Sequence, residues 1–144
     1  MTTPVLPAAD PVDEVQFFVP GKAAPQGSKR HVGRGILVES SKEVGPWRER
    51  VALAAHEAMA GRPVIDGAVS VTLAFVLPRP KSAPKTRTPL ATKRPDLDKL
   101  ERACLDALTD VVFADDSQVI SLLGFKTIAE IGQAPGVTIR VVAR

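Results

Sequence analysis

The stretch PDLDKLERACLDALTDVVFADDSQ, residues 95–118, decides the fold of the chain around it. Its apolar residues recur at helical spacing between positions 97 and 108, so we expect a helix with one core-facing side there. Asp96, directly after Pro95, suits the N-cap of that helix. The stretch also holds seven carboxylates, one group at the start of the helix and another in the turn that ends at Gln118. The expected helix therefore lies between two acidic groups.

The flanking sequence predicts an α/β (α+β) fold, with one compact domain, a mixed sheet of about four or five strands and two main helices. A helix is expected over residues 46–59, with Pro46 in its first position and an apolar stripe formed by Trp47, Val51, Ala54, Ala55 and Met59. Strands are expected where apolar and β-branched residues cluster. These ranges are 15–19, 68–77, 111–113, 119–125 and 137–142, with 36–39 as either a strand or an extended arm.

Length and composition favour a single folded, cytoplasmic domain. The chain has 144 residues, so residues 1–14 are expected to be a flexible proline-rich tail and residues 15–144 the domain. The lone Cys104 cannot form an internal disulfide, which fits a reducing compartment, and it is expected to pack in the core. No apolar run reaches the roughly 18 residues of a membrane span, and residues 1–14 lack the pattern of a signal peptide.

A basic segment precedes the acidic stretch directly. Residues 78–94 contain four prolines and no apolar period, which predicts a mobile loop. The loop carries six cations and no acid: Arg79, Lys81, Lys85, Arg87, Lys93 and Arg94. Two further cations, Lys29 and Arg30, lie in a glycine-rich stretch whose backbone could approach phosphate. A basic loop beside an acidic group indicates metal-dependent chemistry on a polyanion, and nucleic acid is the expected polyanion.

The carboxylates allow a metal site and also a purely structural explanation. Asp96 and Asp98 would lie together at the positive end of a helix, and a chain return through residues 111–113 would bring Asp115 or Asp116 beside them. Such oxygen ligands suit Mg²⁺ or Mn²⁺. The alternative is that the acids only cap the helix and form a turn. A Ca²⁺ loop is excluded, because Glu101 occupies the position that needs glycine.

Arg102 lies between two acids on one face of the expected helix. Asp98, Arg102 and Asp106 follow one another at intervals of four residues. Arg102 could bridge the two carboxylates, or it could point at a substrate phosphate and stabilise developing negative charge. Spacing alone does not decide between these roles.

The stretch PDLDKLERACLDALTDVVFADDSQV resembles the signature of the RusA family of Holliday junction resolvases, D-x-D-N at a helix start, then D-A-L and D-D-x-Q-V. The opening FFVPGKAAPQGSKR, Lys126 and the closing PGVTIRV are similar to further parts of that family. The resemblance implies a homodimeric, Mg²⁺-dependent endonuclease that resolves four-way DNA junctions by paired symmetric nicks in recombination and repair. It also implies a bacterial, prophage or phage origin.

Carried over by position, the resemblance implies that Asp96, Asp98 and Asp116 are metal-binding catalytic carboxylates, with Asp115 as a further metal candidate. Lys99 stands where the family has asparagine, and Arg102 stands where it has a catalytic lysine. Arginine stays charged in proteins, so any catalytic role of Arg102 must be electrostatic. The expected DNA-binding residues are Lys29, Arg30, Lys81, Lys85, Arg87, Lys93, Arg94, Lys99 and Lys126. The alternatives are a non-catalytic protein that binds branched DNA, and a metal-dependent nuclease acting on other branched nucleic acids.

Overall fold

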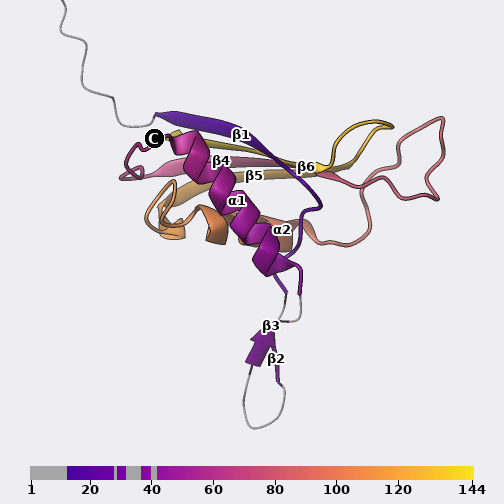
Figure 1. The fold of residues 1–144 in the computed structure, drawn as a ribbon, viewed down its shortest axis with the longest axis horizontal. Helices are drawn as coiled ribbons and strands as arrows, with labels where there is room; N and C mark the ends of the chain where they lie inside the picture. Colours follow the sequence, from indigo (N-terminus) through magenta and orange to yellow (C-terminus); the bar gives the residue numbers. More distant parts are fainter. Residues whose placement is uncertain (1–12, 28, 32–36, 40–41) are drawn as a thin grey trace, which may run out of the picture.

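A four-stranded mixed sheet forms the centre of the molecule (Figure 1). The computed structural model describes residues 13–27, 29–31, 37–39 and 42–144. Strands β1 (Glu14–Pro20), β6 (Gly136–Ala143), β4 (Val69–Leu77) and β5 (Val119–Ile128) lie side by side in that order. β4 and β5 run parallel, whereas β6 is antiparallel to both β1 and β4. The predicted fold, one compact domain with a mixed sheet and two main helices, is confirmed.

Two helices, α1 (Val44–Met59) and α2 (Leu97–Leu108), cover one face of the sheet and pack against each other. Every second residue of β4, from Val69 to Leu77, is buried against them, and the residues in between are half-buried on the opposite face. Phe75, Leu100 and Phe113 are among the largest fully buried side chains. The apolar side of α2 was predicted correctly and consists of Leu100, Ala103, Cys104, Ala107 and Leu108.

Helix α1 begins at Val44, two residues earlier than predicted. Pro46 is therefore its third residue and still lies in the first turn, where a missing N–H breaks no helical hydrogen bond. Its buried stripe consists of Val44, Trp47, Val51, Ala55 and Met59, and Ala54 is only half-buried. At the other end, Arg62 donates to the carbonyls of Ala58 and Met59.

The strand predicted over residues 111–113 is wrong. These residues form a turn after α2, in which the Val111 and Val112 amides donate to the Leu108 carbonyl. Phe113 makes only isolated bridges, to Ile65 and Thr109. Val112 and Phe113 are fully buried because they close the core beneath the end of α2. Their apolar, β-branched composition reflects this burial and does not reflect pairing in the sheet. β5, in contrast, extends three residues beyond its predicted end.

A small hairpin, β2 (Lys29–His31) paired with β3 (Leu37–Glu39), projects from the body beyond the start of α1 (Figure 1). It confirms the first alternative for residues 37–39, and Ile36 lies outside the described residues. Of the predicted tail, residues 1–12 also lie outside them. Glu14 belongs to β1 and forms an ion pair with Arg140 at 2.5 Å, so the ordered domain begins earlier than expected. Within the described residues, neither helix has the length and apolarity that crossing a bilayer would require.

Candidate active site

A pocket of about 900 Å³ opens at the carboxyl ends of the two parallel strands. Leu77 and Ile128, the last residues of β4 and β5, form part of its wall. The remaining wall comes from residues 22–27, Glu43 before α1, the loop of residues 78–94 and the start of α2. Ligand sites in open α/β sheets lie outside the carboxyl ends of the strands. This pocket is therefore the natural place for a substrate.

Cations surround this pocket. Its lining includes Lys22, Lys93, Arg94 and Lys99, together with the acids Asp96 and Glu43. Lys81, Lys85 and Arg87 lie exposed on the same loop, outside the pocket wall. A polyanion that entered the pocket would meet positive charge from three segments of the chain, and the predicted acid at the helix start would lie beside it. For Lys29 and Arg30, the structure places the backbone on β2 and says nothing of the side chains.

Arg79 has a different role from the other cations of the loop. Its guanidinium donates to the Thr88 hydroxyl at 2.8 Å and to the Arg87 carbonyl at 2.6 Å. It also donates to the carbonyls of Pro84 and Ala129. Since all of these acceptors belong to the protein, Arg79 holds the loop together. The loop, which contains no helix or strand, is thus organised around one of its own basic residues.

The first acidic pair, Asp96 and Asp98, lies at the start of α2. Asp96 is the N-cap residue as predicted, with extended backbone angles, yet its side chain makes no capping hydrogen bond. Its nearest cationic group is Lys99 Nζ, 4.0 Å from Oδ2. Asp98 is exposed in the first turn. Both carboxylates are therefore free to accept an external ligand, at the end of the helix where negative charge is favoured.

Lys126 fixes the chain that leads into this pair. Its ammonium donates to the carbonyls of Lys93 and Pro95, each at 2.8 Å. The residue lies on β5 and is half-buried. In the structure it anchors the segment immediately before Asp96, and its predicted contact with DNA stays a prediction. Nothing in the sequence pattern indicates that its partners are backbone carbonyls.

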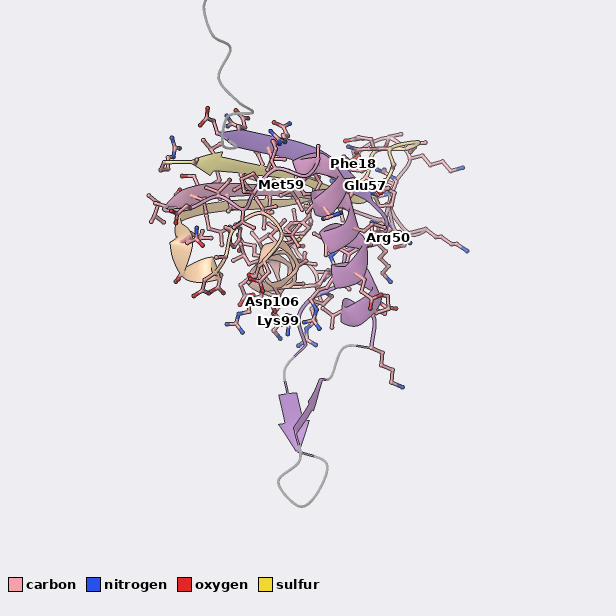
Figure 2. All side chains as sticks on the ribbon, turned by 60° about the vertical axis from the view of Figure 1, so that its left-hand side comes forward. Phe18, Arg50, Glu57, Met59, Lys99 and Asp106 are labelled. Carbon is pink, nitrogen blue, oxygen red and sulfur yellow. The ribbon has the colours of Figure 1, made fainter. Side chains whose placement is uncertain are left out.

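Arg102 does not bridge the two acids on its face of α2. Asp106 instead forms an ion pair with Arg48 of α1 at 3.7 Å, and Arg48 also donates to Gln26 at 2.8 Å. Figure 2 labels Asp106 and Lys99 on this helix. Arg102 is exposed and makes no hydrogen bond or ion pair with the described residues. Of its two predicted roles, only the one directed at an external group remains.

The second acidic pair lies in a short 3₁₀ helix, η1 (Asp116–Gln118), immediately before β5. Asp115 precedes it and accepts a hydrogen bond from the Ser117 hydroxyl at 2.9 Å. This bond, with another from Asp116, lowers the pKa of Asp115 below its ordinary value. The pKa of Asp116 is raised, mainly by its hydrogen bond with Asp115, then by slight desolvation and by the negative charges of Asp115 and Asp106.

Gln118 ties this turn to the rest of the fold. Its carbonyl oxygen accepts from the amides of Ala114 and Asp115, at 2.8 and 2.9 Å. Its amide group donates to the carbonyls of Ile65 and Gly67, at 2.9 and 2.8 Å. Gln118 was not among the predicted site residues. The signal was present, because a glutamine three residues after an N-cap acid is typical of a capping box.

The two acidic pairs lie at opposite ends of β5. Lys126, near its carboxyl end, holds the backbone before Asp96, whereas Asp116 precedes its first residue. At about 3.3 Å per residue, Val119 and Lys126 are roughly 23 Å apart along the strand. Among the residues that the structure describes, no three Asp, Glu, His or Cys side chains are gathered closely enough to hold a metal ion. The metal ligands Asp96, Asp98, Asp115 and Asp116 thus stay a prediction.

Glu101 joins the first pair, which the sequence analysis did not foresee. It is half-buried beside β5, where a Cβ on Gly124 would overlap its carboxylate. Its pKa is raised, first by burial and then by the negative charge of Asp98. The start of α2 therefore carries three acids, although only Asp96 and Asp98 are exposed to solvent.

Comparison with known proteins gives two findings. The chain matches the family described as "Endodeoxyribonuclease RusA" over residues 20–142. It is also 28% identical over 124 residues to the uncharacterized protein YqaN of Bacillus subtilis (strain 168), covering 77% of this chain and 85% of that protein. The family match includes both acidic pairs, the basic loop, strands β4 and β5 and nearly all of β6, whereas β1 lies before it except for Pro20. This chain belongs to the RusA family of endodeoxyribonucleases.

Proposed function

We propose that this protein is a divalent-metal-dependent endonuclease that acts as a homodimer and resolves four-way DNA junctions by paired nicks. One observation carries the proposal beyond the family assignment. The uncapped carboxylate of Asp96 lies in the wall of a cation-lined pocket at the carboxyl ends of β4 and β5. A phosphodiester bound by these cations would lie beside an acidic group that is free to hold a metal ion.

The donor chemistry fits Mg²⁺, with Mn²⁺ as a substitute. Mg²⁺ is usually bound through one or two carboxylates, with water and substrate phosphate completing its shell. Asp96 and Asp98 can supply that pair. Asp116, with Asp115 beside it, is the proposed further ligand, and because it lies at the opposite end of β5 it would have to come from the second subunit of the proposed homodimer. When bound, such an ion lowers the pKa of a water molecule and polarises the scissile phosphate.

The residues of the chain would have separate tasks. Lys93, Arg94 and Lys99 would bind backbone phosphates at the pocket, and Lys81, Lys85 and Arg87 would extend this contact along the loop. Arg102 would stabilise negative charge on the phosphoryl oxygens, since it has no partner among the described residues. Lys29 and Arg30 would add contacts from the hairpin. The expected products carry a 5′-phosphate and a 3′-hydroxyl.

The test is cleavage of a synthetic four-way junction with Mg²⁺ or Mn²⁺. We expect symmetric nicks from the wild type, and a loss of at least about 100-fold in Asp98→Asn with junction binding retained. Asp110→Asn is the matched control: this exposed acid has a φ of 68°, a conformation that asparagine adopts readily. Equal inactivity of wild type and Asp98→Asn with both metals would contradict the proposal.

A second candidate is a protein that binds branched DNA without cutting it. Its specific support is Lys99, which replaces the asparagine of the family signature and places an ammonium 4.0 Å from Asp96. Unchanged junction affinity with no heat of Mg²⁺ binding in calorimetry would favour this candidate. A panel with flap, duplex and RNA substrates separates junction resolution from a nuclease activity on other branched nucleic acids.

A further inference from the structure

The pocket beside Asp96 has walls of mixed chemistry. More than half of its lining residues are proline, alanine, leucine or isoleucine, and six of them are proline. The cations Lys93, Arg94 and Lys99 belong to the same lining. A phosphate needs cations and N–H donors but no apolar wall. The pocket therefore suits a group that carries a phosphate and also has a flat apolar face, as a nucleotide does.

Gln26 contributes a carboxamide of fixed orientation to this lining. Its Oε1 accepts a hydrogen bond from Arg48 Nη1 at 2.8 Å. Arginine has only donors, so the amide oxygen must be the atom that faces Arg48. Nε2 has no hydrogen-bond partner among the residues that the structure describes. What Gln26 offers to a ligand in the pocket is therefore a pair of N–H donors, while its acceptor is already engaged.

Both helices hold this amide beside the acidic pair. The Gln26 backbone N–H donates to the Lys99 carbonyl at 2.9 Å, in the first turn of α2. Arg48, on α1, also forms an ion pair with Asp106 of α2 at 3.7 Å. Figure 2 labels Lys99 and Asp106 on that helix. Because these partners belong to rigid elements, Gln26 is held in place before a ligand enters.

We propose that the pocket takes an unstacked nucleobase next to the scissile phosphate, and that Gln26 recognises an acceptor atom on the edge of this base. The proposal rests on the proposed function, because it assumes a phosphodiester bound at Asp96. Moving a base out of its stack costs least where pairing and stacking are already interrupted, as at the branch point of a junction. The apolar wall would contact the face of the base, and the cations would hold its phosphate.

The fixed amide predicts which bases are accepted. Glutamine usually pairs with adenine through both amide groups, with the oxygen accepting from N6 and the nitrogen donating to N7. Since Arg48 engages the oxygen of Gln26, adenine can form only one of these bonds. Guanine presents the acceptors O6 and N7, thymine presents O4, and an unstacked cytosine exposes O2 and N3. Adenine is therefore expected to be the poorest base in the pocket.

Cleavage of a panel of four-way junctions tests this assignment. The junctions differ only in the nucleotide next to the nick, on either side of it, which is A, C, G or T in turn. We expect the wild type to cut its best junction at least about tenfold faster than the adenine junction, and Gln26→Ala to lower this ratio below about threefold. The matched control is Gln16→Ala, an exposed glutamine on β1, which should keep the wild-type ratio.

Two results of this panel would overturn the assignment. One is a wild type that cuts all of the junctions equally well. The other is a preference that Gln26→Ala leaves intact, as expected if Gln26 only bound a DNA phosphate, because all junctions would then lose affinity by the same factor.

Gln26→Glu reverses the chemistry of the side chain at nearly unchanged size. With one carboxylate oxygen on Arg48, the other oxygen can only accept, as a carboxylate does from the amino group of cytosine. Adenine, which has an amino group, should then be cut faster than thymine, which has none. An unchanged order of these two bases would contradict recognition by Gln26.

Arg48 acts in this scheme as a positioning residue. Arg48→Ala frees the Gln26 amide to turn, so its oxygen can accept from adenine and the preference against adenine should fall. Arg48→Lys should recover part of the preference, since an ammonium group is also only a donor. A purely structural role of Arg48 would slow all junctions by the same factor, and that outcome would refute selection by a fixed amide.

Fluorescence of 2-aminopurine tests base capture without cleavage. This adenine analogue lacks the N6 amino group, so it can accept from Nε2, and its emission rises when it leaves the stack. In metal-free complexes we expect a rise at a position beside the branch point, a smaller rise with Gln26→Ala, and none in the middle of an arm. A bound wild type that gives no rise overturns the proposal.

The two levels of inference can fail separately. If the wild type binds the junction without cutting it, the proposed function fails, and the 2-aminopurine signal still decides whether the pocket takes a base. If the wild type cuts the junction with no base preference and no fluorescence rise, the proposed function stands and the base pocket is refuted. A chain that binds no junction refutes both.

Discussion

The two acidic pairs are built in contrasting ways. Asp96 and Asp98 begin a helix without capping it, and the backbone before them is held from outside by Lys126. Asp115 and Asp116 belong to a turn that is held by a hydrogen bond from Ser117 to Asp115 and by those from Gln118 to the carbonyls of Ile65 and Gly67. The first pair keeps its carboxylates available. In the second pair, Asp115 accepts a hydrogen bond from Ser117 and raises the pKa of Asp116.

This difference shows that two acidic pairs in one stretch of chain can differ in how readily their carboxylates bind a cation. An uncapped carboxylate at a helix N-terminus is stabilised in its charged form by the helix dipole, so it needs no partner from the protein. A carboxyl whose pKa is raised by its neighbour, as that of Asp116 is, keeps its proton to a higher pH and binds a cation only above that pH. The contrast leads to three predictions, from the largest expected effect to the smallest.

Gln118→Ala, in the turn that carries the second pair, should cause the largest loss in the free energy of unfolding. The substitution removes four hydrogen bonds: two that Gln118 accepts from the amides of Ala114 and Asp115 within the turn, and two that it donates to the carbonyls of Ile65 and Gly67. At about 0.5–1.5 kcal/mol each, we expect a loss of about 2–4 kcal/mol in the free energy of unfolding, measured by urea denaturation. The control is Ser117→Ala, which removes one exposed hydrogen bond and should cost less than about 1 kcal/mol. Equal losses in both variants would show that Gln118 does not organise the turn.

Much of the fold could be predicted because periodicity is a local property. The second helix was predicted at its observed bounds, since its apolar positions repeat without interruption between an acidic cap and Thr109. The strand expected at residues 111–113 failed because a buried turn and a buried strand have the same composition. Only the tertiary contact of Val112 and Phe113 with the end of α2 distinguishes them.

The candidate site was less predictable, because it depends on how distant segments meet. Asp96 was placed correctly at the helix start, since caps are local features. The expected approach of Asp116 to Asp98 assumed a strand at residues 111–113, which form a turn instead. In the structure the negative charge of Asp106, not that of Asp98, contributes to the raised pKa of Asp116. The hydrogen bonds of Lys126 to two carbonyls follow from the position of β5 beside the loop. A residue type alone does not reveal such partners.

Lys126→Ala should displace Asp96 in the first pair and leave the second pair, Asp115 and Asp116, in place. Two charge-assisted hydrogen bonds disappear at a half-exposed position, so we expect a loss of about 1–2 kcal/mol in the free energy of unfolding. Displacement of Asp96 should lower junction cleavage about tenfold at saturating DNA. Lys126→Arg keeps the charge and should recover part of the lost stability and part of the lost cleavage rate. If Lys126 instead only bound a DNA phosphate, Lys126→Ala would bind the junction more weakly but cleave it at the normal rate at saturating DNA. Nuclear magnetic resonance shifts of residues 115–118 should remain unchanged.

The smallest expected effect is on the titration of Asp116. Its pKa lies above the ordinary value chiefly because of the hydrogen bond with Asp115, so the acid keeps its proton to a higher pH than an isolated aspartic acid does. Cation binding by Asp116 should therefore weaken as the pH falls through this raised pKa. Asp115→Asn removes the neighbouring charge, and the midpoint of Asp116, followed through its side-chain carboxyl carbon without metal, should move to lower pH. Glu14, which pairs with Arg140 at a distant edge of the sheet, provides the control, since its midpoint should not move. A midpoint of Asp116 that does not respond to Asp115→Asn would show that Asp115 does not raise the pKa of Asp116, and the contrast between the two pairs would then rest on backbone geometry alone.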